Sequence, residues 1–183
     1  ESVESNIWMG NASTNGQFDG LVTLLLADAT VVDSPNDTVT SSNVIAELTA
    51  TVDLIPAKVR NAPDLMFYVA PNIYYSYSRA LGGFGASGLG AAGYDNKGAV
   101  ELKPLMFEGI PMFIAEGLSS NYAVVAQKSN LWFGTGLLSD QNEVKVLDMA
   151  ELDGSKNVRF ISRFTAGVQY GIGSEIVLYA PAH

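Results

Sequence analysis

The spacing of apolar residues between positions 44 and 55 predicts an amphipathic helix. A polar cluster at residues 41–43 offers an N-cap before it, and Pro56 limits the helix at the other end. The apolar residues recur at intervals of three or four and form one stripe, which packs against a core in most soluble helices. The members of this stripe are Val44, Ile45, Leu48, Val52 and Ile55.

A second helix is predicted directly after a buried strand. Residues 65–69 are a continuous apolar run between Pro63 and Pro71, which is typical of a central strand covered on both faces. Pro71 suits the first position of a helix, and two glycines end that helix. Its inward face is predicted to hold Ile73, Tyr77, Ala80 and Leu81. The apolar run at residues 21–26 is too short to distinguish helix from strand.

The second half of the chain has the pattern of short strands. The β-type runs are separated by Gly, Pro, Ser and Asn and lie at residues 99–102, 110–115, 122–126, 131–133 and 144–147. Helical patterns in the first half and strands in the second predict an α+β fold.

Apolar and polar residues alternate most clearly at residues 158–170. This pattern predicts one long strand with a buried face and a solvent-exposed face. The apolar positions are Val158, Phe160, Phe164, Ala166, Val168 and Tyr170. The polar positions between them are Arg159, Arg163, Thr165 and Gln169. Residues 175–179 are expected to be the hairpin partner of this strand or its continuation.

Composition points to one packed domain that does not bind nucleic acid directly. The chain has 183 residues, of which 48% are apolar, enough for one well-buried core. Its net charge of −9 offers no surface for a phosphate backbone. No apolar run reaches the roughly 18 residues that a membrane span requires.

The residue types needed for several kinds of chemistry are missing. The chain has no Cys, which excludes disulfides, thiolate metal sites and cysteine nucleophiles. Its only His is His183 at the end of the chain, a poor place for a general base or a zinc ligand. We therefore predict no catalytic residue, no cofactor and no metal. Since the sequence starts at Glu1 rather than Met, we expect it to be a processed or partial chain.

A glycine-rich loop at residues 82–98 contains a literal GxGxxG. The dinucleotide fingerprint requires a strand before it and a helix after it, but here a helix precedes and a strand-like run follows. A subunit contact is therefore preferred over a cofactor site. The candidate contact residues in the loop are Gly82, Gly83, Phe84, Gly85, Gly88 and Gly90.

Two other groups of residues are assigned to ordinary structure. The carboxylates Asp148, Glu151 and Asp153 fit no EF-hand spacing and indicate a solvated turn, and turn chemistry is also expected at residues 33–37. On the helix after Pro71, Tyr77 is expected to point inward. Tyr74 and Tyr75 are expected to cover the edge of the core or a subunit contact.

In the order of its segments, the chain resembles the HK97-like major capsid proteins of tailed bacteriophages. The likeness covers about residues 8–179 and lies in the pattern more than in signature words. It includes a Gly- and Asn-rich loop from Trp8, the amphipathic helix, and the buried strand followed by Pro71 and Asn72. A Gly-aliphatic-Pro strand at residues 109–112 and the long final strand from Asn157 complete it.

The resemblance implies an HK97-like capsid fold. The axial (A) domain would span residues 10–156, and residues 1–9 and 157–183 would belong to the peripheral (P) domain. The N-arm, extended loop and spine helix would lie upstream of Glu1. Cross-linking members join an Asn, here matched by Asn157, to a Lys in the extended loop with the help of a Glu. Phe164 stands at the position of that Glu, so we do not expect covalent cross-linking.

The resemblance also implies a function and partners. The chain would be a structural subunit of an icosahedral capsid that assembles in the host cytoplasm into pentamers and hexamers and encloses the DNA genome. Its partners would be other copies of itself, with scaffold, portal or decoration proteins as further candidates. Neither sequence-specific contact with nucleic acid nor a membrane is expected.

Three alternatives stay open. An encapsulin-like compartment would use the same fold around protein cargo. A nucleotide-binding enzyme would use the loop at residues 82–98. A monomeric binding module of a tail or decoration protein would form no ring or shell.

Overall fold

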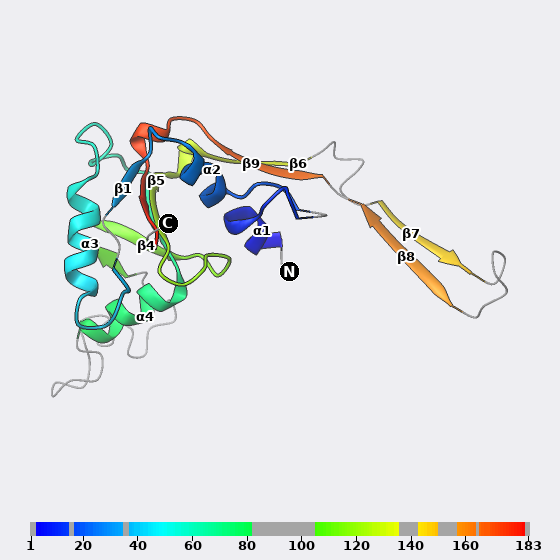
Figure 1. The fold of residues 1–183 in the computed structure, drawn as a ribbon, viewed down its shortest axis with the longest axis horizontal. Coiled ribbons are helices and arrows are strands. Elements are labelled where there is room, and N and C mark those ends of the chain that lie inside the picture. Colours follow the sequence, from blue (N-terminus) through cyan, green and yellow to red (C-terminus); the bar gives the residue numbers. More distant parts are fainter. Residues whose placement is uncertain are drawn as a thin grey trace.

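The structure is a computed structural model, and it describes residues 3–14, 17–34, 37–81, 105–135, 143–149, 157–163 and 165–181. It consists of a layered body from which a β-ribbon projects (Figure 1). The body holds a six-stranded mixed sheet with the strand order β1-β10-β5-β2-β4-β3. In that order the strands are Val32–Ser34, Val177–Tyr179, Ala123–Gln127, Leu65–Val69, Ile110–Ile114 and Met106–Phe107.

Two layers of helices cover this sheet. The helices α3 (Val44–Asp53) and α4 (Pro71–Ala80) pack on one face, and α1 (Val3–Met9) and α2 (Leu21–Ala27) pack on the other (Figure 1). Alternate residues of the central strands enter the two cores, because successive side chains of a strand point to opposite faces. On β5, for example, Val125 lies in the core under α3 and α4, and Val124 lies in the core under α1 and α2.

The central strand β2 confirms the prediction from the apolar run only in part. Leu65, Phe67 and Val69 are buried under α3 and α4, but Met66 and Tyr68 on the other face are half-buried. Phe67 is fully buried, which contributes about 2–3 kcal/mol of hydrophobic stabilisation.

The two predicted helices are present, with corrections at their ends and faces. On α3, Ile45 does not belong to the buried stripe but is 48% exposed. Asn43 makes no side-chain cap to α3, because its Oδ1 instead accepts hydrogen bonds from the backbone N–H and hydroxyl of Thr40. On α4, Ile73 and Tyr77 are buried as predicted, whereas Leu81 lies past the last helical residue and is exposed.

Three segments were uncertain or wrongly predicted from sequence. The ambiguous run after Gly20 is the helix α2. Asp33 lies within strand β1 and not in a turn, because that strand pairs in parallel with β10. The strand β10 is neither partner nor continuation of the preceding strand: it lies between β1 and β5 of the body sheet.

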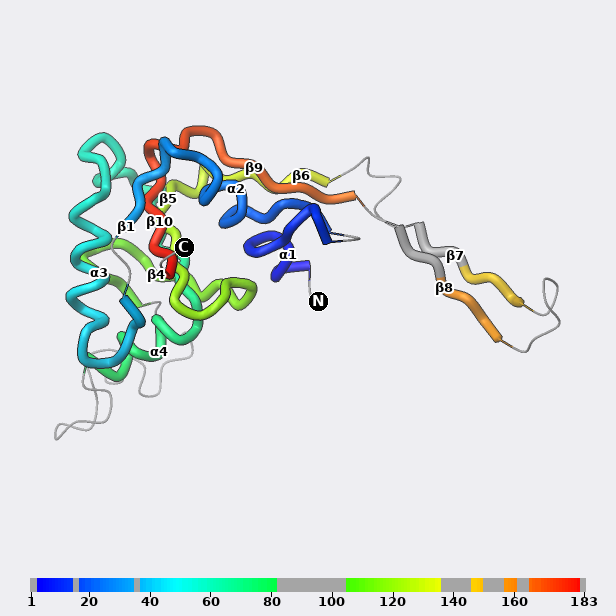
Figure 2. The backbone as a smooth tube through the Cα atoms, in the orientation of Figure 1, coloured from blue at the N-terminus to red at the C-terminus, as the bar shows by residue number. Residues whose placement is uncertain are grey.

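The long strand predicted for residues 158–170 is two strands, β8 (Val158–Arg163) and β9 (Ala166–Tyr170). They have different antiparallel partners, since β8 pairs with β7 (Glu143–Asp148) and β9 pairs with β6 (Leu131–Thr135). The chain leaves the body along β6, forms the β7–β8 hairpin and returns along β9 (Figure 2). The four strands are called the ribbon below.

The ribbon joins the body at two short 3-10 turns, η1 (Lys128–Asn130) and η2 (Gly173–Glu175). The predicted boundary between axial and peripheral residues, at 156/157, falls between the two strands of the β7–β8 hairpin. That division into domains stays a prediction.

Candidate functional site

The ribbon exposes apolar side chains that a water-soluble strand would normally bury. Phe160 is 72% exposed, and its cross-strand partner Val146 is 58% exposed. Val158 lies two residues from Phe160, on the same face of β8, and is 53% exposed. The alternation in the sequence therefore marks an apolar face as predicted, but this face is not covered by the described part of the chain.

The part of the ribbon nearer the body carries two more exposed aromatic rings. Trp132 and Phe133 of β6 are 60% and 51% exposed. As neighbours on one strand they point to opposite faces. Trp132 is held in place by a hydrogen bond from its Nε1–H to the carbonyl oxygen of Ser129, at 3.0 Å. An exposed apolar surface of this kind usually marks a protein–protein contact.

The ribbon also has open strand edges. Both of its sheets are two-stranded, so among the described strands each of them lacks a neighbour on its outer side. An isolated two-stranded sheet is marginally stable in water, and an unpaired edge readily pairs with another chain. The β7–β8 hairpin lies away from the body (Figure 1), so the body cannot cover its edges or its apolar face. Leu131, Val168 and Tyr170, on β6 and β9, instead pack against the core under α1 and α2.

Asn157 lies directly before β8 and is exposed. Its carbonyl oxygen accepts a hydrogen bond from the N–H of Met149 at 3.0 Å, which extends the hairpin ladder beyond the last strand pair. The other predicted contact residues, Gly82, Gly83, Phe84, Gly85, Gly88 and Gly90, lie outside the described residues. Of the predicted acidic cluster only Asp148 is described, in β7.

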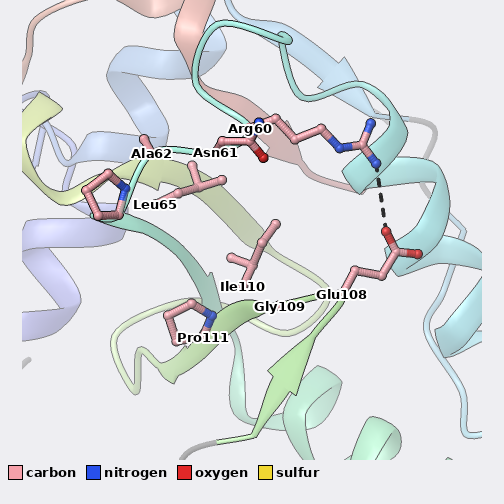
Figure 3. A pocket seen from close by; sticks show the side chains of 9 residues that line it. Arg60, Asn61, Ala62, Leu65, Glu108, Gly109, Ile110 and Pro111 are labelled. Carbon is pink, nitrogen blue, oxygen red and sulfur yellow. Dashed lines mark ion pairs between the residues drawn. The ribbon is translucent and has the colours of Figure 1, made fainter.

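A pocket of about 340 Å³ lies between the segment before β2 and the β3–β4 turn (Figure 3). Leu65, Ile110 and Pro111 line it, and Arg60 reaches across its mouth toward Glu108 (Figure 3). The guanidinium Nη2 is 3.8 Å from a carboxylate oxygen of Glu108 and equally far from one of Asp53. Arg60 and Glu108 are half-exposed and paired with each other, and Asp53, the second partner of Arg60, is exposed.

Polar side chains cluster where the ribbon meets the body. Tyr170, the last residue of β9, donates its hydroxyl to Asp28 Oδ2 at 2.8 Å. Burial, together with the hydrogen bond to Asp28 and its charge, raises the pKa of Tyr170 to about 12. The N–H of Thr30 and the hydroxyl of Tyr170 lower the pKa of the Asp28 carboxyl.

The turn η1 at the start of β6 is held by Asp64. The carboxylate of Asp64 accepts hydrogen bonds from the hydroxyl of Ser129 at 2.5 Å and from the side-chain amide of Gln127 at 3.1 Å. The bond from Ser129 is the main cause of the lowered pKa of this carboxyl. Asp64 directly precedes β2, so it links the central strand of the body to the base of the ribbon.

Metal and membrane sites are not apparent in the part of the chain that the structure covers. No group of three or more His, Cys, Asp or Glu side chains in that part is arranged to hold a metal ion. None of the helices within the described ranges combines the length and apolar character that a bilayer crossing needs.

The sequence indicated the apolar positions of the ribbon but not that they are exposed. A period of two identifies which residues share a face, and it contains no signal about whether another layer covers that face. The sequence predicts a strand at Trp132 and Phe133 but gives no indication that their rings are exposed. The polar cluster at the base of the ribbon had no signal in the sequence, because its members are up to 142 positions apart.

No family model matches the sequence, and no curated protein matches it. Solved structures do match. A structure of Gordonia phage Cozz aligns over 99% of this chain and 59% of its own, with a TM-score of 0.59 at 13% identity. One of Mycobacterium phage Che8 aligns over 81% of this chain and 53% of its own, with a TM-score of 0.59 at 11% identity.

A third match is the satellite phage P4 procapsid that includes the size determination (Sid) protein. It covers 92% of this chain and 56% of that chain, with a TM-score of 0.50 at 13% identity. The chain thus spans somewhat more than half the length of each of these structures. The likeness confirms the predicted fold class, an α+β fold of the HK97-like capsid type.

Proposed function

We propose that the chain is a structural subunit of an icosahedral phage capsid that assembles with other copies of itself into pentamers and hexamers around a DNA genome. The observation that carries this proposal is the projecting ribbon, whose exposed apolar face includes Val146, Val158 and Phe160. The capsid-type fold and the P4 procapsid among the structural neighbours support it.

The ribbon has the properties that a contact between subunits needs. Its apolar face gains hydrophobic free energy when covered, and its open edges gain hydrogen bonds when paired. Contacts between a surface of one copy and a different surface of the next close into rings when the rotation between copies allows it. A subunit that acts only by such contacts needs no catalytic residue, and non-covalent contacts through the ribbon would seal the shell without a cross-link at Asn157.

The partners and location follow from this role. Other copies of the chain are the main partners, and scaffold, portal or decoration proteins would bind the assembled surface. The subunit would reside in the virion capsid after assembly in the host cytoplasm. The net charge of −9 favours contacts with proteins over direct contact with packaged DNA.

The test is the assembly state of the complete gene product that contains this chain. Light scattering and negative-stain electron microscopy should show closed shells, or rings of five and six subunits. A strict monomer under every assembly condition would contradict the proposal and would favour the monomeric binding module. Shells that contain protein cargo and no DNA would favour an encapsulin-like compartment.

A pair of variants tests the role of the ribbon. Phe160→Thr should abolish or weaken assembly, because it removes the most exposed aromatic ring of the apolar face. Ile45→Thr is the matched control: it also removes an exposed apolar side chain, but from α3 of the body. Equal assembly of both variants and the unaltered protein would show that the ribbon face is not a contact.

A further inference from the structure

The base of the ribbon contains a buried asparagine, Asn130. Both its side-chain oxygen and its side-chain nitrogen form hydrogen bonds. Asn130, at the end of η1, is only 8% exposed. Its Oδ1 accepts hydrogen bonds from the N–H groups of Gly171 at 3.1 Å and Ile172 at 2.8 Å. Its Nδ2 donates to the carbonyl oxygen of Ile172 at 2.9 Å.

These bonds continue the ribbon ladder into the body. The last β6–β9 pair is Leu131 with Tyr170, and beyond it the chain of η1 turns away from the strand direction. The Asn130 side chain takes the place of a strand backbone beside Ile172, since one amide supplies both an acceptor and a donor. The N–H of Gly171 is shared between Asn130 Oδ1 and the backbone carbonyl oxygen of Asn130, which is also 3.1 Å away. Residues 171 and 172 thus keep their hydrogen bonds although no strand lies beside them.

The close fit leaves no space for a larger residue at position 171. A Cβ atom added to Gly171 would lie 2.8 Å from Asn130 Oδ1. Two residues later, a Cβ on Gly173 would lie 2.5 Å from Asp28 Oδ2, the oxygen that accepts the Tyr170 hydroxyl. The chain therefore passes through a confined path as it returns from the ribbon to β10.

Three residues hold this joint. Asp64, before β2, fixes η1 through Ser129. Asp28, at the end of α2, holds β9 through Tyr170. Asn130 ties these two sides together, because it belongs to η1 and binds the residues that follow β9.

We propose that Asn130, together with the Asp28–Tyr170 hydrogen bond, is a joint that fixes the direction in which the ribbon leaves the body. Since the ribbon carries the apolar contact face, the joint also sets the angle at which neighbouring subunits meet. The second statement rests on the proposed function, and the first does not.

The direction of the ribbon can be measured in the unassembled protein. The chain has no Cys, so spin labels can be placed on introduced cysteines without background. Ala46→Cys on α3 and Thr165→Cys next to β9 are exposed positions on the body and on the ribbon. Pulsed electron paramagnetic resonance should give one narrow distance distribution in the parent pair. Asn130→Ala in the same background should broaden or shift that distribution.

Amide exchange gives a local readout of the same joint. Asn130→Ala should accelerate exchange of the Ile172 amide about tenfold, as expected when one buried hydrogen-bonding partner is lost. The Gly171 amide keeps its bond to the backbone carbonyl oxygen of residue 130 and should change less. Asn130→Asp keeps the acceptor oxygen and loses the donor, so the Ile172 amide should stay protected. Asn157→Ala, at an exposed asparagine of the ribbon, is the matched control and should change neither measurement.

Tyr170→Phe keeps the test decisive if Asn130→Ala does not fold. It removes a single oxygen atom, and it should broaden or shift the distance distribution through loss of the bond to Asp28. Distance distributions in the folded variants that equal that of the parent would contradict the proposal that Asn130 and the Asp28–Tyr170 bond fix the direction of the ribbon. A changed distribution with normal particle diameter in assembled shells would keep the joint and overturn its role in subunit geometry. If the parent protein does not assemble, the proposed function is contradicted. The distance measurement on the unassembled protein still tests the joint.

Discussion

The hydroxyl of Tyr170 and the carboxylate of Asp28 form a 2.8 Å hydrogen bond between residues 142 positions apart. It joins the last residue of the ribbon strand β9 to the residue that follows α2. The bond favours the uncharged tyrosine and the ionised aspartate. It therefore raises the pKa of Tyr170 and lowers the pKa of Asp28.

The stability contributed by Tyr170 should be lost in strong alkali. Because its pKa is raised to about 12 in the folded protein, the neutral form is favoured by folding. The contribution is complete below the ordinary pKa of 10 and is lost as the pH rises through about 12. Burial also raises the pKa of Tyr179, so absorbance titration of the phenolates should show a late-ionising group of tyrosines that is smaller by one in Tyr170→Phe. Tyr75→Phe, at an exposed position of α4, should leave that late step in place.

Asp64 should make stability depend on pH in acid. Its pKa is lowered in the folded protein, chiefly by the hydrogen bond from Ser129. The contribution is therefore present above the ordinary value of 3.8 and is lost as the pH falls through the lower folded pKa. Denaturant unfolding from pH 2 to 7 should show Asp64→Asn less stable than the parent near neutrality, with the difference shrinking in acid. A difference that stays constant with pH would contradict this assignment.

Phe67→Ala should destabilise the body by about 3–5 kcal/mol, because it empties a fully buried site in the central strand. Urea unfolding measures the loss. Phe113→Ala on the adjacent strand β4 is the control: that ring is half-exposed, and its centroid lies 5.9 Å from that of Tyr68 in an edge-to-face arrangement. Its truncation should cost about 1 kcal/mol or less. Similar losses in both variants would show that Phe67 is not the centre of the core.

Gly117→Ala should destabilise the packing of α1. A Cβ at position 117 would lie 2.3 Å from the carbonyl oxygen of Glu4, and this clash is with backbone that cannot rotate away. A loss of about 1–3 kcal/mol is expected. Gly167→Ala in β9 meets no atom within 4 Å and should be neutral or stabilising by up to about 1 kcal/mol. Thermal unfolding of the two variants distinguishes a steric effect from a general effect of replacing glycine.

The sequence by itself determined two of the helices, the central strand and the fold class of this chain. Periodicity located α3 and α4, and proline positions marked where they begin or end, because these signals depend on neighbouring residues only. The order of segments was sufficient to predict the HK97-like fold.

The tertiary structure alone decided which apolar faces are covered. Val52 and Phe160 both follow a regular pattern, yet Val52 is buried by the sheet and Phe160 is 72% exposed on the ribbon. Burial depends on which distant segments pack together, and strand alternation does not contain that information. The same reason explains why β10 was misplaced and why the joint at Asn130 was not foreseen: both depend on contacts between residues at least 41 positions apart.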